Sequence, residues 1–192
     1  MTRELLFATH NKNKTKEINQ IIENFQILNL EDINFNQEIV ENGKSFRENA
    51  EIKVDAIRPY YQGNIFADDS GLVIPALNGS PGIYSSRYAG TGNSVDNIEK
   101  VLKELEFSSD RSAYFVAVIC LWLDGEKYFF EGRVEGEILP SPKGEGGFGY
   151  DPIFLPKGHH QSFALLSSEA KNSISHRGKA VQAMKSLLFE QI

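Results

Sequence analysis

The sequence predicts a mixed α/β protein, and two patterns carry that prediction. Near the start of the chain, the short apolar segment 5–8 precedes Ile18 and Ile21, whose spacing is helical. In the middle of the chain, two apolar segments flank Asp124-Gly125, a strong signal for a two-residue hairpin turn. Alternating strands and helices favour parallel pairing and a hairpin requires antiparallel pairing, so we expect a mixed sheet with flanking helices.

Each expected element rests on a local pattern. A serine and a glutamate three residues apart, Ser45 and Glu48, form a capping box that opens the second helix. Apolar residues at helical spacing predict the third and last helices, with Val95 on the packed side of the third. The expected strands are 5–8, 26–30, 65–69, 114–123 and 127–137, and the expected helices begin after residue 14 and at residues 45, 94 and 176.

Length and composition limit the classes of function. With 192 residues, 41% of them apolar, the chain can form one core, and we expect a single domain over residues 1–192. A net charge of −6 argues against a nucleic-acid or membrane surface. No secretion signal or run of roughly 18 apolar residues is evident, so we expect a cytoplasmic protein. The single cysteine, Cys120, lies in an apolar run and should be buried.

The most informative stretch is an apolar run that stops at Asp68, Asp69, Ser70 and Gly71. A strand sends successive side chains to opposite faces, so the two carboxylates can have different roles. We expect the strand to end here, with Gly71 allowing a sharp turn. The alternative is an ordinary polar turn after a strand.

A polar loop follows the first strand and precedes the first helix. Free N–H groups at a helix N-terminus, together with lysines, favour a phosphate. The alternative is a solvated loop in which an asparagine or threonine caps the helix. The candidate substrate-binding residues in this loop are Thr9, His10, Asn11, Lys12, Asn13 and Lys14.

Two further basic residues are candidates for an anionic ligand. Lys53 lies four residues after Asn49, so both share one helical face, which is either solvated or turned toward Asp69. Arg87 lies between Tyr84 and Tyr88, which fits ligand binding and surface stacking equally well.

The glycine loop, residues 144–151, has the composition of a site for a planar base. Phe148 and Tyr150 offer aromatic faces, and Asp151 offers a carboxylate for the edge of the base. The alternative is a glycine-rich turn with a buried aromatic residue. Further on, Ser175 can cap the last helix, which puts His176 and Arg177 in its first turn. Positive charge opposes the helix dipole there, so we expect Arg177 to serve a ligand.

Five motifs in this order resemble the inosine triphosphate pyrophosphatase family, also called Ham1-like, over the length of the chain. They are Thr9-x-Asn11-x-x-Lys14, the stretches 67–72, 79–88 and 147–154, and Lys171-x-x-x-Ser175-His176-Arg177. The resemblance implies a long twisted mixed sheet, two lobes around a central cleft and a homodimer. It also implies Mg²⁺-dependent hydrolysis of ITP, dITP or XTP to the nucleoside monophosphate and pyrophosphate.

The resemblance also implies roles for individual residues. Asp69 would be the catalytic base, and Asp68, Asp69 and Glu41 would hold the metal, with Glu38 as the alternative glutamate. The loop from Thr9 to Lys14, Lys53 and Lys171 would hold the triphosphate, with Ser70 and Arg87 as further contacts. The base pocket would comprise Phe148, Gly149, Tyr150, Asp151, His176 and Arg177.

Two other classes of function remain open at this point. One is a pyrophosphatase for pyrimidine or other modified nucleotides. The other is a nucleotide-binding protein without catalysis, against which the presence of both Asp68 and Asp69 argues.

Overall fold

The computed structural model describes residues 3–190 and contains a six-stranded sheet in the order β2-β1-β3-β4-β5-β6. The first strand pairs in parallel with β2 and β3, whereas β5 pairs with β6 in the antiparallel sense, so the predicted mixed sheet is confirmed. The strands are β1 (Arg3–Phe7), β2 (Phe25–Leu28), β3 (Ile65–Val73), β4 (Ser112–Leu123), β5 (Glu126–Ile138) and β6 (Phe154–Pro156). The α-helices are α1 (Lys12–Ile21), α2 (Phe46–Ile57), α3 (Ser94–Glu104), α4 (Ser168–Ile174) and α5 (His176–Glu190).

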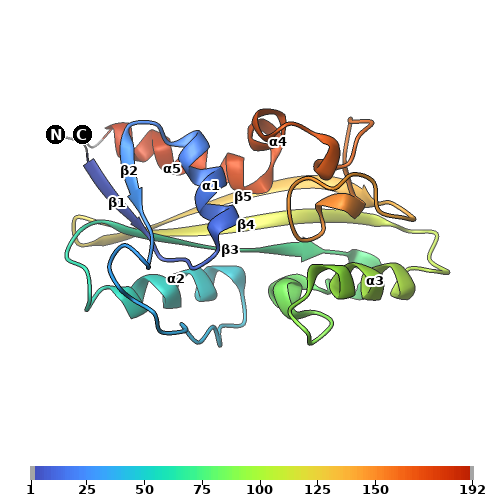
Figure 1. Ribbon diagram of the computed structural model, residues 1–192, viewed down its shortest axis with the longest axis horizontal. Coiled ribbons are helices and arrows are strands. Elements are labelled where there is room, and N and C mark those ends of the chain that lie inside the picture. Colours follow the sequence, from blue (N-terminus) through green and yellow to red (C-terminus); the bar gives the residue numbers. More distant parts are fainter. Residues whose placement is uncertain (1–2, 191–192) are drawn as a thin grey trace. The chain divides into compact units, whose positions relative to one another are not determined.

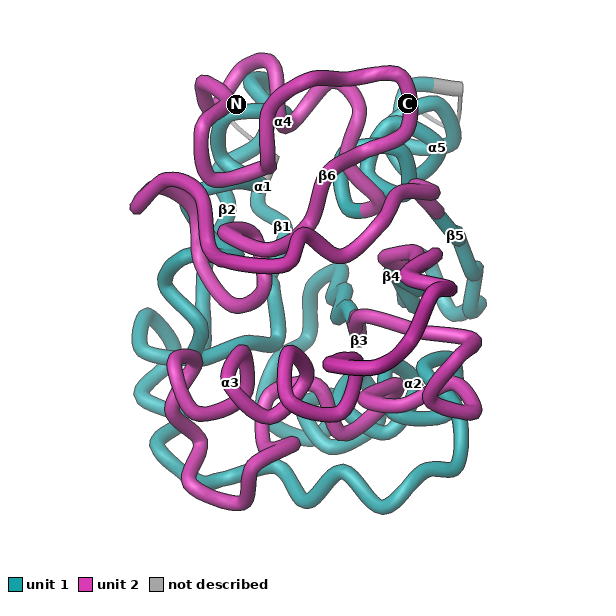
Figure 2. The backbone as a smooth tube through the Cα atoms, turned by 90° about the vertical axis from the view of Figure 1, so that its right-hand side faces the viewer, with its two compact units in different colours: residues 1–69, 117–132, 177–192 teal, residues 70–116, 133–176 magenta. Residues whose placement is uncertain are grey.

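The chain divides into two compact units, coloured separately in Figure 2. Unit 1 comprises residues 1–69, 117–132 and 177–192, and unit 2 comprises residues 70–116 and 133–176. Strands β3, β4 and β5 each contribute residues to both units. The single domain over residues 1–192 and its central cleft stay predictions, and residues 1–2 and 191–192 lie outside the described part of the chain.

Unit 1 has a helical layer on each face of its strands (Figure 1). On one face, Phe7 and Phe66 stack with their ring centroids 4.4 Å apart, and they pack with apolar residues of α1 and α5. On the other face, the neighbouring residues Leu6 and Ala67 pack with α2. Because buried side chains alternate between the two faces, consecutive positions in β3 are presented to different helices.

Unit 2 has an aromatic core covered by α3. The rings of Phe115, Phe154 and Phe163 contact one another, and Ile98 and Val101 of α3 belong to the same cluster. The expectation that Val95 packs inward is wrong, because its side chain is 59% exposed. The helix instead buries a polar residue, Asn97.

The strand β3 differs from its prediction at its end. It continues through Gly71 to Val73, so both the predicted sharp turn and the alternative polar turn are wrong. The physical reason lies beyond the acidic pair, where Leu72 and Ile74 are fully buried in the core of unit 2 and keep the chain extended.

Other local predictions are confirmed. The hairpin turns between Leu123 and Glu126, and Ser45 caps α2 by accepting a hydrogen bond from Glu48 N at 3.1 Å. The carboxylate of Glu48 accepts from Lys44 N and not from the capping residue itself. Cys120 is fully buried, and burial raises the pKa of its thiol to about 12.

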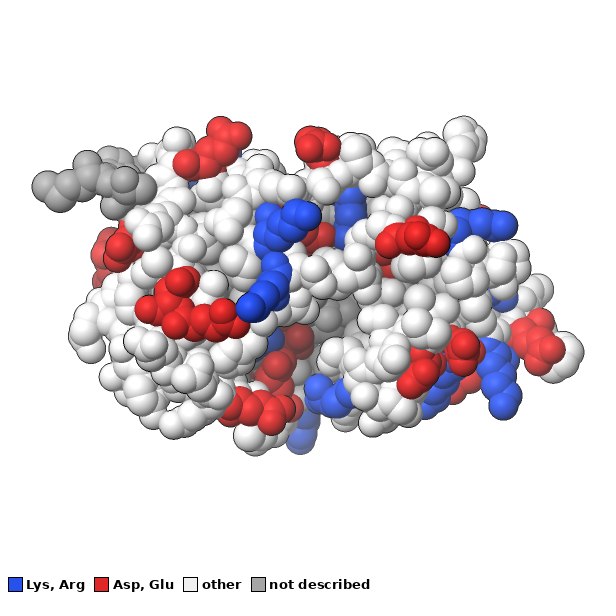
Figure 3. Space-filling view, viewed as in Figure 1, with Lys and Arg blue, Asp and Glu red and all other residues white. Residues whose placement is uncertain are grey.

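The charged surface and the lengths of the helices can be described for the same residues. Acidic and basic side chains are interspersed over the face shown in Figure 3. Within residues 3–190, no helix is both long enough and apolar enough to cross a membrane.

Candidate active site

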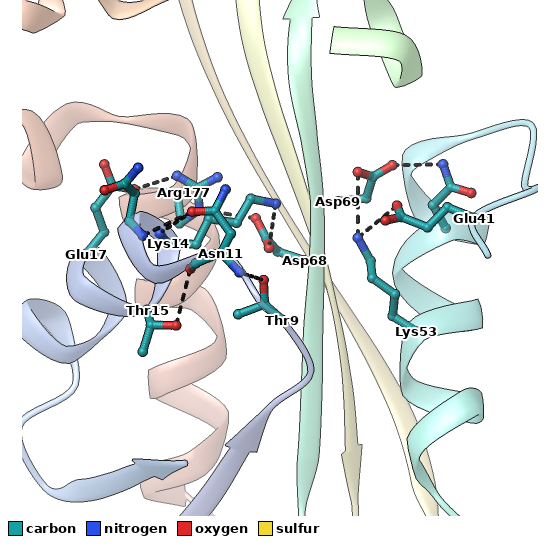
Figure 4. Close-up of polar contacts among 12 residues, drawn as sticks. Thr9, Asn11, Lys14, Thr15, Glu17, Glu41, Lys53, Asp68, Asp69 and Arg177 are labelled. Atoms are coloured by element: carbon teal, nitrogen blue, oxygen red, sulfur yellow. Dashed lines mark hydrogen bonds and ion pairs between the residues drawn. The ribbon is translucent and has the colours of Figure 1, made fainter. Parts of the chain in front are cut away.

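Strand β3 presents Asp68 and Asp69 to opposite sides, as the sequence predicts (Figure 4). Asp68 points toward α1 and α5, and Asp69 points toward α2. Both residues are buried, with exposed fractions of 2% and 8%. Two buried carboxylates one residue apart therefore have separate surroundings.

Asp68 belongs to a balanced network of charges. Its Oδ1 accepts from Lys14 Nζ at 2.9 Å, and its Oδ2 accepts from Arg177 Nε at 3.1 Å. Arg177 also donates to Glu17 of α1 through Nη1. Two acids thus face two bases, and all four lie in unit 1.

This network lowers the pKa of the Asp68 carboxyl. Burial alone would raise that pKa, but the Lys14 ammonium and the Arg177 guanidinium outweigh burial and hold it well below its usual range. Burial has the opposite effect on a cation, and it lowers the pKa of Lys14 in spite of the neighbouring Asp68. Asp68 is therefore a permanent anion that compensates buried cations.

The polar loop before α1 forms a helix cap. Asn11 Oδ1 accepts from Asn13 N at 3.0 Å and from Lys14 N at 3.2 Å, and Thr9 Oγ1 accepts from Asn11 N. The alternative in which an asparagine caps the helix is thus what the structure shows, and α1 begins at Lys12. Phosphate binding by this segment stays a prediction.

His10 and Lys12 of this loop contact residues outside the acidic pair of β3. His10 Nε2 lies 3.1 Å from the carbonyl oxygen of Gln37, and Lys12 forms an exposed ion pair with Glu31. Of the six candidate residues, Lys14 is the one whose side chain has a hydrogen bond to an acidic residue of β3.

Asp69 has polar neighbours from α2 and from the segment before it. Asn49 Nδ2 donates to Asp69 Oδ2 at 3.0 Å, and Lys53 Nζ lies 3.8 Å from Asp69 Oδ1. The same ammonium is 3.0 Å from Glu41 Oε2. The shared face of Asn49 and Lys53 is therefore buried and turned toward Asp69. Between the two candidate glutamates, Glu41 is in this group, and Glu38 is exposed.

The environment of Asp69 raises the pKa of its carboxyl. Burial is the main cause, and the attraction of Lys53 and Lys14 and the hydrogen bond from Asn49 offset it only in part. A carboxylate with a raised pKa is a stronger base than an ordinary aspartate, which suits a residue that must accept a proton near neutral pH.

The residues around Asp69 fit a divalent cation. Asp69 and Glu41 both lie close to Lys53 Nζ, at 3.8 Å and 3.0 Å, so their carboxylate oxygens lie near one another and offer oxygen ligands. Among residues 3–190, no group of three or more His, Cys, Asp or Glu residues could hold a metal ion. Magnesium suits such a site because it prefers oxygen ligands and keeps several waters. Since Asp68 is engaged by Lys14 and Arg177, Asp69 and Glu41 are the better candidates.

In unit 2, Asp151 organises the glycine loop. Its Oδ2 accepts from Phe148 N at 2.8 Å and from Lys171 Nζ at 2.6 Å, and the Lys171 ammonium lies 4.7 Å from the centre of the Phe148 ring. Gly147 has φ = 71°, and a Cβ there would lie 2.0 Å from Asp151 Oδ2. Only glycine therefore fits at position 147.

The other residues predicted to contact the base differ in burial and in the residues that they contact. Tyr150 is buried, and its hydroxyl donates to the carbonyl oxygen of Ser85 at 2.8 Å. His176 stacks on Phe115, with ring centroids 4.7 Å apart. Phe148 is half-buried, and Gly149 has φ = 60°. Outside the predicted base pocket, the candidate Ser70 follows Asp69 in β3. Arg87 is exposed, with its guanidinium 5.3 Å from the Tyr84 ring, which matches the surface arrangement.

The structure thus groups the candidates into a unit 1 cluster and a unit 2 cluster. Unit 1 holds Lys14, Glu41, Lys53, both aspartates and Arg177, and unit 2 holds the glycine loop, Lys171 and His176. Sequence reasoning missed Glu17, although it lies three residues after Lys14 on the same helical face. It also gave no role to Asn49, whose signal was its spacing from Lys53.

In a mixed α/β fold, a buried carboxylate of raised pKa beside a lysine marks a candidate catalytic site. Comparison with known proteins gives the family. Residues 5–187 match the Ham1 family, and the chain belongs to that family. Its backbone is similar to the Staphylococcus aureus Ham1 protein, with a TM-score of 0.89 and 38% identity over 99% of this chain and 100% of that one.

Curated relatives are more similar in sequence. A dITP/XTP pyrophosphatase from Flavobacterium johnsoniae is 48% identical over 96% of this chain and 97% of its own length. Another dITP/XTP pyrophosphatase, from Bacillus subtilis, is 43% identical over 97% of each chain. A Ham1 protein from Coxiella burnetii has a TM-score of 0.89, covering 98% of this chain and 99% of that one.

Proposed function

We propose that this protein hydrolyses dITP, XTP and ITP to the nucleoside monophosphate and pyrophosphate. The observation that carries the proposal is the surroundings of Asp69, a buried carboxylate of raised pKa that contacts Asn49 and Lys53. The names of the curated relatives support the choice of substrates.

In the proposed reaction, Asp69 accepts a proton from the water that attacks the α-phosphorus. Asn49 holds the carboxylate in place through its hydrogen bond. Lys53 and Lys14 offset the negative charge of the triphosphate, and the leaving group is pyrophosphate. Mg²⁺ held by Asp69 and Glu41 would supply further charge neutralisation at the phosphates.

Selection of the base is assigned to two kinds of contact. Phe148 stacks on the base without regard to its identity, since every base has a π-face. Arg177, which already donates to Asp68 and Glu17, would also donate to the 6-oxo group of inosine or xanthine, and a guanidinium has no acceptor for the 6-amino group of adenine. Leaving such groups unpaired in a desolvated pocket discriminates strongly, so ATP should be a poor substrate.

The test is pyrophosphate release over a panel of ITP, dITP, XTP, GTP and ATP with Mg²⁺, in ¹⁸O-labelled water. We expect the first three to be hydrolysed fastest, with the label entering the monophosphate. Orthophosphate as the first product would show attack at the γ-phosphorus and would refute the proposal. A preference for pyrimidine nucleotides would favour the related pyrophosphatase class instead.

We also propose a homodimer that works in the cytoplasm, as the family resemblance implies. Sedimentation equilibrium of the purified protein measures the mass in solution. A mass of 21.5 kDa, that of one chain, would contradict the dimer.

A further inference from the structure

Ser85 connects three separate segments of unit 2. It lies in the 3-10 helix η2 (Gly82–Arg87). Its Oγ accepts from Leu72 N of β3 at 2.9 Å and donates to the carbonyl oxygen of Gly82 at 2.6 Å. Its own carbonyl oxygen accepts from the Tyr150 hydroxyl at 2.8 Å. One half-buried serine therefore joins β3, η2 and the glycine loop.

Helix α3 fixes the segment that carries Ser85. Asn97, which is 3% exposed, donates to the carbonyl oxygen of Ser86 at 3.2 Å and accepts from Ala89 N at 2.7 Å. Lys100, three residues later on the same face, donates to the carbonyl oxygen of Tyr88 at 2.9 Å. Buried polar groups with satisfied hydrogen bonds specify one conformation, so η2 is a fixed support.

The glycine loop needs such a support. Gly147 and Gly149 have positive φ angles and leave the backbone around Phe148 with more conformational freedom than other residues would. On the C-terminal side of Phe148, Tyr150 binds Ser85 and Asp151 binds Phe148 N. The position of the Phe148 ring therefore depends on where Tyr150 is held.

We propose that Ser85 is a positioning residue for the nucleobase pocket. Through its hydroxyl it fixes η2 to β3, three residues after Asp69, and through its carbonyl oxygen it holds Tyr150 and hence Phe148. The inference rests on the proposed function, because it assigns Phe148 to a bound base. Its consequence is that loss of either contact weakens binding of the base and leaves hydrolysis of bound substrate unchanged.

The first test is Tyr150→Phe, which removes one hydroxyl and keeps the ring. We expect KM for ITP to rise on the order of tenfold, the scale of one lost hydrogen bond, with kcat within about twofold of the wild type. Tyr128→Phe is the matched control, because Tyr128 donates to Glu126 at the same 2.8 Å in unit 1. Its KM should equal that of the wild type.

Tripolyphosphate separates a role in base binding from a general structural role. It has the phosphates of the substrate and no base, so its inhibition constant should be the same in Tyr150→Phe and the wild type. An equal loss for tripolyphosphate and ITP would overturn the inference. If the wild type hydrolyses ITP and Tyr150→Phe has the same KM for ITP as the wild type, the inference is also overturned. A wild type with no activity on ITP would refute the proposed function itself.

A second pair of variants tests the hydroxyl of Ser85. Ser85→Ala should raise KM for ITP in the same way, since Leu72 N and the carbonyl of Gly82 lose their partner. Ser85→Thr keeps a hydroxyl and should restore most of the affinity. Equal KM values for wild type, Ser85→Ala and Ser85→Thr would overturn the proposal even if Tyr150→Phe failed to fold.

Discussion

The two faces of β3 each carry an aspartate, and the surroundings shift the pKa values of the two carboxyls in opposite directions. On one face, Asp68 meets Lys14 and Arg177, and its pKa falls. On the other face, Asp69 meets Asn49 and a more distant Lys53, and its pKa rises. Both carboxylates are buried, so burial does not distinguish them. The difference lies in how closely cations surround each one.

This difference separates a structural anion from a reactive one. A carboxylate held by two direct ion pairs has little tendency to accept a proton, and its removal leaves buried cations without compensation. A buried carboxylate with a raised pKa can bind a proton more readily than an ordinary aspartate. We therefore expect substitution of Asp68 mainly to lower stability and substitution of Asp69 mainly to lower activity.

The largest expected effect is on the Asp68 face. Arg177→Ala and Asp68→Asn should each lower the free energy of unfolding by about 3–5 kcal/mol, because each breaks a buried ion pair. The double variant should lose less than the sum of the two, with a coupling of roughly 0.5–3 kcal/mol. Urea unfolding of the four proteins measures this cycle. Strict additivity would show that the pair is not coupled.

On the Asp69 face, Asp69→Asn should lower kcat at least about 100-fold, the scale of losing a positioned base. Its urea midpoint should stay at or above that of the wild type, because the neutral form of residue 69 already suits its buried site. Steady-state pyrophosphate release and urea unfolding test both statements. Near wild-type turnover with Mg²⁺ would exclude Asp69 as the base.

The pH dependence of stability should have opposite signs on the two faces. The folded pKa of Asp68 is lowered, so its stabilisation is full above the ordinary pKa of about 3.9 and is lost as pH falls through the folded value. The folded pKa of Asp69 is raised, so its ionisation costs stability as pH rises through the folded value.

Chelator-treated wild type, Asp68→Asn and Asp69→Asn, unfolded in urea between pH 3 and pH 8, test these signs. The deficit of Asp68→Asn should shrink toward pH 3. Any advantage of Asp69→Asn should grow with pH. Parallel curves for the two variants would contradict the difference between the faces.

The smallest expected effect comes from an exposed ion pair between α1 and the segment that follows β2. Lys12 and Glu31 are 3.2 Å apart, but their side chains are 81% and 55% exposed, whereas those of Lys14 and Asp68 are 15% and 1% exposed. Lys12→Ala should cost less than about 1 kcal/mol of unfolding free energy, and salt should reduce that further. Lys14→Ala should cost more at every salt concentration. Equal losses for the two variants would show that burial does not set the strength of these pairs.

Local patterns predicted most of the fold. The turn at Asp124-Gly125, the cap at Ser45 and the start of the last helix at His176 all depend on neighbouring residues, and all three are found. The failure at Gly71 has a nonlocal cause. The residues after it are buried by partners distant in sequence, which a local turn pattern does not reveal.

The sequence predicted which residues lie at the candidate site better than it predicted which of them contact one another. The opposite directions of Asp68 and Asp69 follow from the strand period of two. The ion pair between Asp68 and Arg177 has no local signal, because it depends on how α5 packs on the strands. The sequence likewise named Tyr150 without indicating that its hydroxyl would bind η2.

The Asp68 network also has an order of assembly. Arg177 is 109 residues from Asp68 and 160 residues from Glu17 along the chain. During synthesis, the two acids and Lys14 leave the ribosome long before the arginine does. Contacts of such separation form late, because closing a long loop costs entropy before any contact offsets it. A nascent chain that has finished β3 has both acids of this network but only one of its two bases, so the network can reach its native charge balance only after Arg177 has been synthesised.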